Sequence, residues 1–207
     1  GNRDMTETAE NKDFYVPELT FPPEEQALVR EMYSGAQTVL EYGTGGSTVL
    51  ALDVGVPHLI AVESDKDWLD NIQRIVDDRK PKAKVDLYHA DIGPTKKWGT
   101  PDGNDYWMKY PRYPLQVWEQ PFFEHPDVVL IDGRFRVGCF LTVLARATKP
   151  VTVLFDDYTG RSTYSRAGQF MPPTHTVGRI GVWELDGTWK LDGKDLTIFV
   201  DTFFKIR

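Results

Sequence analysis

Glycines and acidic residues follow the short apolar runs of this sequence, and their types and spacing fit the chemistry of ligand binding. Glycine lets a backbone approach a ligand closely at the start of a helix, and a carboxylate accepts hydrogen bonds from hydroxyls or amines. Five apolar runs end in this way, and the residues are Gly43 to Gly46, Glu63, Asp91, Asp132 and the pair Asp156-Asp157. The pattern predicts a ligand that carries hydroxyls, amines or a cation.

The spacing of the glycine loop and Glu63 points to one part of such a ligand. Glu63 lies 20 residues beyond Gly43 and closes the next apolar run. An acid at that distance is placed to accept hydrogen bonds from ribose hydroxyls. A dinucleotide site would read G-x-G-x-x-G, but Thr48 stands at the third glycine position. The spacing indicates an adenosine-type cofactor and leaves open whether it is NAD or another adenosyl ligand.

The elements that must position these residues alternate between strand and helix. Strands are predicted at 38–42, 58–63, 85–91, 127–132 and 151–155. Helices are predicted from the Pro22-Pro23 start, between Gly46 and Gly55, after Asp65, and through Phe140 to Leu144. Alternation of this kind predicts an α/β fold with a mostly parallel sheet covered on both faces, a Rossmann-like three-layer sandwich.

The end of the sequence has a different pattern. From about residue 175 it is rich in β-formers and carries Asp186-Gly187 and Asp192-Gly193, a typical hairpin signal. We expect an antiparallel hairpin to finish the sheet, with 196–204 as its last strand. The expected organisation is a polar arm over 1–20 and one domain over 21–207.

Composition limits the function classes. The chain has 207 residues, a net charge of −7 and a single cysteine, Cys139. The charge argues against nucleic acid and anionic membranes as partners. The lone cysteine rules out an internal disulfide framework and a cysteine-clustered zinc site. No apolar run approaches the roughly 18 residues of a membrane helix, and the first 15 residues do not resemble a signal peptide. We expect a cytoplasmic protein.

The segment Val39-Leu40-Glu41-Tyr42-Gly43-Thr44-Gly45-Gly46-Ser47 resembles the first motif of class I S-adenosylmethionine-dependent methyltransferases. That motif reads acidic-x-G-x-G-x-G, and Ser47 replaces its third glycine. The resemblance extends from about residue 36 to the C-terminus and includes the terminal hairpin. It implies S-adenosylmethionine as cofactor, with Glu41, Gly43, Gly45 and Gly46 at the methionine end, Glu63 at the ribose and Asp91 at the adenine end.

Two later segments, 127–133 and 154–158, are similar to bacterial small-molecule O-methyltransferase-like proteins. The resemblance implies that Asp132, Asp156 and Asp157 face the substrate and could hold a magnesium ion, which prefers such oxygen ligands. Arg134 stands where relatives often place a base. Arginine stays protonated, so it fits an anionic substrate group better. Alternatively, Arg134 and Arg136 pair with Asp156 or Asp157 and leave no metal site.

The segment 93–126 is unusually aromatic. It carries eight aromatic residues, namely Trp98, Tyr106, Trp107, Tyr110, Tyr113, Trp118, Phe122 and Phe123. It could close over the substrate, pack against a second subunit of a homo-oligomer, or cover an edge of the sheet. The leading hypothesis is methyl transfer to a small molecule, most plausibly at a hydroxyl oxygen, with Asp132, Asp156 and Arg134 as catalytic candidates. The alternatives are a non-catalytic module that acts through 93–126 and, more weakly, an NAD-dependent oxidoreductase.

Overall fold

The structure is a computed structural model that describes residues 13–207, so most of the predicted N-terminal arm lies outside the described residues. Seven strands form one sheet in the order β3-β2-β1-β6-β7-β9-β8. The parallel strands are β1 (Thr38–Tyr42), β2 (His58–Glu63), β3 (Lys84–His89), β6 (Val128–Ile131) and β7 (Val151–Phe155). The antiparallel strands are β8 (His175–Val177) and β9 (Ile180–Leu185). The α/β fold with a mostly parallel sheet and a final antiparallel hairpin is therefore confirmed.

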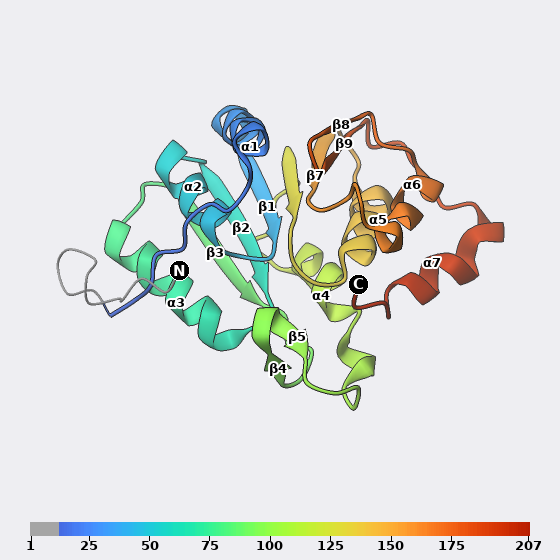
Figure 1. The fold of residues 1–207 in the computed structure, drawn as a ribbon, viewed down its shortest axis with the longest axis horizontal. Helices are drawn as coiled ribbons and strands as arrows, with labels where there is room; N and C mark the ends of the chain where they lie inside the picture. Colours follow the sequence, from blue (N-terminus) through green and yellow to red (C-terminus); the bar gives the residue numbers. More distant parts are fainter. Residues whose placement is uncertain (1–12) are drawn as a thin grey trace.

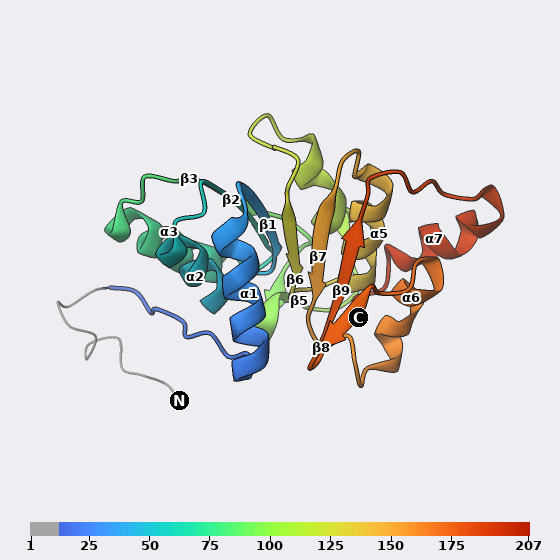
Figure 2. The same ribbon diagram turned by 90° about the horizontal axis from the view of Figure 1, so that it is seen from above.

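Helices cover both faces of this sheet, as Figures 1 and 2 show. One face carries α1 (Pro23–Gly35), α2 (Gly46–Val54) and α3 (Lys66–Arg79). The other face carries α4 (Arg112–Leu115), α5 (Arg136–Arg146), α6 (Ser165–Phe170) and α7 (Leu196–Thr202). Alternate residues of β1 separate the two cores: Val39 packs with α1 and α2, whereas Leu40 packs with α5. Each central strand is buried on both faces, which explains its continuous apolar run.

The predicted last strand is wrong, because residues 196–202 form helix α7. Phe199, Thr202 and Phe203 lie on one side of this helix at spacings of three and four residues, and Phe199 contacts Phe203 at a centroid distance of 5.3 Å. Leu196, Ile198 and Val200 stay about half exposed. The hairpin itself is formed by β8 and β9, whose turn contains Gly178 and Arg179 rather than Asp186-Gly187. The β-prone composition of 196–204 is overridden by packing against α5.

The aromatic segment 93–126 lies mostly against one sheet face. It contains β4 (Thr95–Lys96), β5 (Thr100–Pro101), α4 and three short 3-10 helices, 97–99, 107–109 and 116–119. Tyr113 and Trp118 are buried in the core beside α5, and the Trp118 indole donates to the Tyr42 hydroxyl at 2.8 Å. Trp98, Trp107 and Met108 remain exposed. The buried half of this segment thus acts as part of the core and not only as a cover for the sheet edge.

Residues 13–22 run across the helices of the first face. Phe14 is buried against Val49, Ile72 and Ile75 of α2 and α3. The Tyr15 backbone exchanges two hydrogen bonds with the Asn71 side chain, at 2.8 and 2.7 Å. These contacts fix the segment in place before it reaches α1.

Candidate functional site

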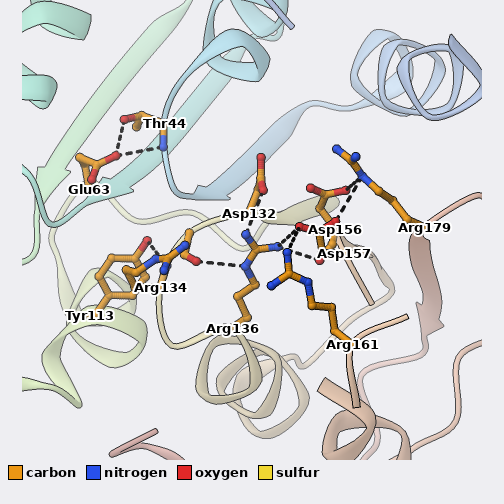
Figure 3. A network of polar contacts seen from close by, with 11 residues as sticks. Thr44, Glu63, Tyr113, Asp132, Arg134, Arg136, Asp156, Asp157, Arg161 and Arg179 are labelled. Carbon is orange, nitrogen blue, oxygen red and sulfur yellow. Dashed lines mark hydrogen bonds and ion pairs between the residues drawn. The ribbon is translucent and has the colours of Figure 1, made fainter. Parts of the chain in front are cut away.

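The candidate site lies at the carboxyl ends of the parallel strands. Strand β1 is the switch point of the sheet, because the chain proceeds from it to β2 and β3 on one side and to β6 and β7 on the other. Ligands of open α/β sheets bind at such a point. Figure 3 shows the residues that meet there, with Thr44 and Glu63 on one side and a group of aspartates and arginines on the other.

Gly43 brings the β1 loop close to the end of β6. Its φ is +97°, and a Cβ at this position would lie 2.5 Å from the Asp132 carbonyl oxygen. Both facts require glycine. Gly133, from the β6 side, leaves equally little room, because a side chain there would collide with the Tyr113 hydroxyl. The glycine loop and the loop after Asp132 are therefore in backbone contact.

Glu63 is buried and makes four hydrogen bonds within the protein. One carboxylate oxygen accepts from the Thr44 hydroxyl at 2.7 Å and the Thr44 amide at 3.2 Å. The other accepts from the amides of Ser64 and Asp65, at 3.0 and 3.1 Å. Burial raises the pKa of Glu63 above its ordinary value, and these hydrogen bonds oppose the shift. The predicted ribose acid thus faces the glycine loop, with Thr44 in contact with it.

Two segments approach this half of the site from outside the sheet. The Ser64 hydroxyl donates to the Gly99 carbonyl at 2.7 Å, so the 95–101 ribbon lies against the end of β2. A Cβ at Gly46, the first residue of α2, would collide with the Glu18 carbonyl oxygen. Residues 18–19 therefore lie directly on the start of α2.

Glu41 does not face the same space as Glu63. It is fully buried on the α1–α2 face, where its carboxylate accepts from the Tyr33 hydroxyl at 2.6 Å and from the Thr48 hydroxyl at 2.7 Å. Burial raises its pKa, against the lowering effect of hydrogen bonds from Ser47, Tyr33 and Thr48. Thr48 also accepts from the Gly45 amide at 3.0 Å. Thr48, which breaks the dinucleotide motif, thus connects Glu41 to the glycine loop.

Asp91 lies at the edge of the site and is half exposed. It accepts from the Gly93 amide at 2.9 Å and pairs with Lys109 of the aromatic segment at 2.9 Å. The Gly93 amide and then Lys109 lower its pKa. Asp91 follows β3, and its carboxylate already pairs with Lys109, so its role at the adenine end stays a prediction.

The three aspartates after β6 and β7 come together, and arginines surround them. Arg136 lies 3.3 Å from Asp132 and 4.0 Å from Asp157. Arg179 donates to Asp156 at 3.1 Å and lies 3.4 Å from Asp157. Arg161 lies 3.8 Å from Asp157 (Figure 3). Of the pairings in that alternative, the one between Arg136 and Asp157 is observed, whereas Arg134 makes no ion pair within residues 13–207.

These contacts do not fit a magnesium ion. Guanidinium groups already take the carboxylate oxygens that would bind a cation, and they would repel it. Among residues 13–207, no group of three His, Cys, Asp or Glu side chains is arranged to hold a metal. The predicted metal ligands Asp132, Asp156 and Asp157 therefore form an ion-pair network, and we derive no chemistry through a metal.

Asp132 has the most altered acidity in this network. Its pKa is raised to about 8, mainly by burial, with Arg136 acting against the shift and Asp156 adding to it. Two adjacent carboxylates cannot both ionise easily, so one of them retains a proton. Asp132 is thus tuned to exchange a proton near neutral pH.

Arg134 lies beside this network without joining it. Its Nε is buried and has no hydrogen-bond partner among residues 13–207. Burial and then the nearby Arg136 lower its pKa. Phe135, the next residue, has a φ of +53°, which is a strained value for a bulky side chain. Arg134 and Arg136 flank this residue, and of the two only Arg136 forms ion pairs with the aspartates.

Sequence reasoning missed Arg179, Thr44 and Thr48 as members of the site. Arg179 lies in the β8–β9 turn, 23 residues beyond Asp156, and no local motif marks it. Thr44 lies within the glycine loop itself. Its place between Gly43 and Gly45 is the sequence signal that could have identified it.

Comparison with known structures identifies the family of the chain. A methyltransferase-like protein from Silicibacter pomeroyi, solved at 1.80 Å, is 39% identical, with a TM-score of 0.87 over 92% of this chain and 98% of that one. The chain belongs to the methyltransferase-like proteins of the class I methyltransferase superfamily. The methyltransferase-like chain described here has the α/β fold that its segment 39–47 predicts.

One more distant structure shares the fold. A cofactor-bound protein from MTB is 16% identical, with a TM-score of 0.51 over 82% of this methyltransferase-like chain and 80% of its own. An O-methyltransferase from Bacillus cereus in complex with SAH is 16% identical, with a TM-score of 0.47 over 78% and 66%. No protein-family model matches the sequence, and no curated protein matches it. None of the helices within 13–207 has the length and apolar character needed to cross a bilayer.

Proposed function

We propose that the protein binds S-adenosylmethionine and transfers its methyl group to a hydroxyl oxygen of a small molecule. The observation that supports this most strongly is the arrangement at the switch point, where Gly43, Glu63 and Asp132 meet around the end of β1. The family supplies the fold, and these three residues supply the chemistry that such a cofactor needs.

The residues fit the cofactor in two ways. The buried carboxylate of Glu63 is an acceptor for two ribose hydroxyls once Thr44 gives up its contacts. The Gly43 backbone, which has no side chain, can approach the methionine end closely. When bound, the cofactor supplies a sulfonium-activated methyl group, so the protein needs mainly to align the acceptor and remove its proton.

Asp132 is the group best suited to accept that proton. A base works most efficiently when its pKa lies near the working pH, and the pKa of Asp132 is raised to about 8. Arg136 holds the carboxylate at 3.3 Å and fixes its orientation. With the cofactor bound, Asp132 would accept the hydroxyl proton while the acceptor oxygen takes the methyl group, and the methyl–sulfur bond would break to leave S-adenosylhomocysteine.

Calorimetry with S-adenosylhomocysteine tests the cofactor assignment. Wild-type protein should bind it, and Glu63→Ala should bind at least tenfold more weakly, because a charged hydrogen-bond acceptor is lost. Glu31→Ala, an exposed acid on α1, serves as the control and should bind like wild type. Equal binding by Glu63→Ala would contradict the site.

A second candidate is a non-catalytic methyltransferase-like module. It is favoured by one observation, namely that both carboxylate oxygens of Glu63 already accept hydrogen bonds from the protein, four in all. It predicts no binding of S-adenosylhomocysteine at millimolar concentration. The same calorimetry therefore separates the two candidates.

A further inference from the structure

A cavity of about 250 Å³ lies beside the aspartate–arginine network and has an unusual lining. Its charged lining residues are Arg166 of α6 and, near the end of the chain, Lys205 and Arg207. No Asp or Glu side chain lines it, although the chain as a whole has 31 acidic and 24 basic residues. The three cationic side chains in the lining therefore differ from the acidic balance of the whole molecule.

These basic side chains are not used elsewhere in the described structure. Within 13–207, no ion pair joins Arg166, Lys205 or Arg207 to a carboxylate, whereas Arg136, Arg161 and Arg179 all pair with aspartates. The hydroxyls of Ser162 and Thr163 also line the cavity and add hydrogen-bond donors. Charged donors and hydroxyls without an internal acceptor form a suitable site for an oxyanion.

The cavity borders the elements that hold the catalytic candidates. Val137 in its lining follows Arg136 directly, and Tyr164, next to Thr163, receives the Arg136 guanidinium over its ring at 5.5 Å. The positive charge of Arg207 also lowers the pKa of Arg134, although burial and Arg136 lower it more. In Figure 1, α6 and α7 lie next to α5.

We propose that this cavity binds an oxyanion, a phosphate or carboxylate group, carried by the methyl acceptor. Its volume suits such a group with a few attached atoms, because sites for drug-sized ligands begin at about 300 Å³. The oxyanion would anchor one end of the acceptor while its hydroxyl reaches Asp132. The role of the acceptor rests on the proposed methyl transfer, but the oxyanion site itself does not.

Titration with inorganic phosphate tests the oxyanion site alone. Calorimetry should show binding to the full chain in the low millimolar range or tighter, and Arg166→Gln/Lys205→Gln should weaken it roughly tenfold or more. The control Arg30→Gln removes an exposed cation of α1 and should change nothing. The single variants Arg166→Gln and Lys205→Gln repeat the measurement if the double variant fails to fold. Absence of phosphate binding, or equal binding by these variants, would overturn the proposal.

A second experiment decides whether the oxyanion belongs to the acceptor or is a free ion. Dihydroxybenzenes with and without a ring carboxylate are supplied as methyl acceptors. Wild type should prefer the carboxylated member, and the double variant should lose about tenfold in kcat/KM for it alone. Equal kcat/KM for both members in wild type would overturn the acceptor role. Failure of the protein to bind S-adenosylhomocysteine would remove the proposed function, while the phosphate titration would still decide the oxyanion site.

Discussion

Arg136 joins the ends of two strands through Asp132 and Asp156. Its Nη2 lies 3.3 Å from the Asp132 carboxylate, and its Nη1 donates to the backbone carbonyl of Asp156 at 2.8 Å. A third bond runs from its Nε to the Gly133 carbonyl at 3.0 Å. Because Arg136 is 7% exposed, a buried cation connects the loops after β6 and β7.

Replacement of Arg136 by Met should destabilise the protein strongly. Loss of the guanidinium leaves the carbonyls of Gly133 and Asp156 without their donor, at a cost of about 1 to 3 kcal/mol for each unsatisfied buried group. Urea unfolding followed by circular dichroism gives the free energy of unfolding. The control is Arg161→Gln, since Arg161 is largely exposed and its pair with Asp157 should contribute less than about 1 kcal/mol. Similar losses for both variants would contradict the central role of Arg136.

The raised pKa of Asp132 predicts how stability depends on pH. The carboxyl titrates at about 8 in the folded protein, well above its ordinary value of 3.8, so the folded state holds a proton that the unfolded chain has lost. The stability contribution is complete below about pH 4 and is lost as pH rises through 8. Solvent reaches about a third of the side chain, which reduces the size of the effect.

Urea unfolding at pH 5.5 and 8.5 checks this sign. Wild type should lose more unfolding free energy across that interval than Asp132→Asn, which cannot titrate there. Glu41 and Glu63, whose pKa values burial also raises, are present in both proteins and cancel in the comparison. A steeper loss in Asp132→Asn would contradict the assignment.

The same group should govern the pH dependence of catalysis. If Asp132 accepts the acceptor's proton, kcat/KM should rise with pH, reach half its maximum near 8 and level off above that, as the carboxylate forms. Asp132→Asn should remove that limb and lower kcat/KM by roughly a hundredfold. Measurement of methyl transfer from pH 5.5 to 9.5 provides the test. A profile in wild type that stays flat across this range would exclude Asp132 as the base.

Thr48 should be needed for its hydroxyl. Thr48→Val keeps the shape but removes the donor to Glu41, so a buried carboxylate loses a hydrogen bond at a cost of about 2 kcal/mol. Thr48→Ser retains the donor and should lose less than half as much. Thermal unfolding of the three proteins shows the order, which would be reversed if only the methyl group of Thr48 mattered.

The effects of substitutions at Gly133 and Tyr113 on the free energy of unfolding should be coupled. A side chain at Gly133 collides with the Tyr113 hydroxyl, so Gly133→Ala should destabilise the protein by about 2 kcal/mol. Removal of the hydroxyl in Tyr113→Phe makes room, and the double variant should recover part of the loss. A double-mutant cycle on urea unfolding measures the coupling. Strict additivity would mean that the collision is relieved in another way.

The parallel strands and the glycine loop could be predicted because their signals are local. Continuous apolar runs mark strands buried on both faces, and Gly43 must be glycine for reasons visible in a single turn. The helix at 196–202 could not be predicted in the same way. Its β-branched residues favour a strand, and only the contacts of Phe199 and Phe203 with distant elements decide for a helix.

The ion-pair network shows a second limit. The sequence predicts that the aspartates lie together at the strand ends and bind a ligand with hydroxyls, amines or a cation. Asp132, Asp156 and Asp157 do lie together in the structure. Arg179 neutralises Asp156 from a hairpin turn that local signals placed elsewhere. Charge balance at a site depends on which distant segments meet there, and spacing along the chain does not contain that information.

The contacts of Glu18 with Gly46 and of Gly99 with Ser64 should affect the rate of cofactor binding rather than its affinity. A cofactor that enters between the glycine loop and Glu63 meets segments already seated on both sides of its path. Association that requires such segments to move is slower than association with an open site. In stopped-flow mixing, the observed rate should approach a ceiling as cofactor concentration rises, and that ceiling is the opening rate of the protein itself.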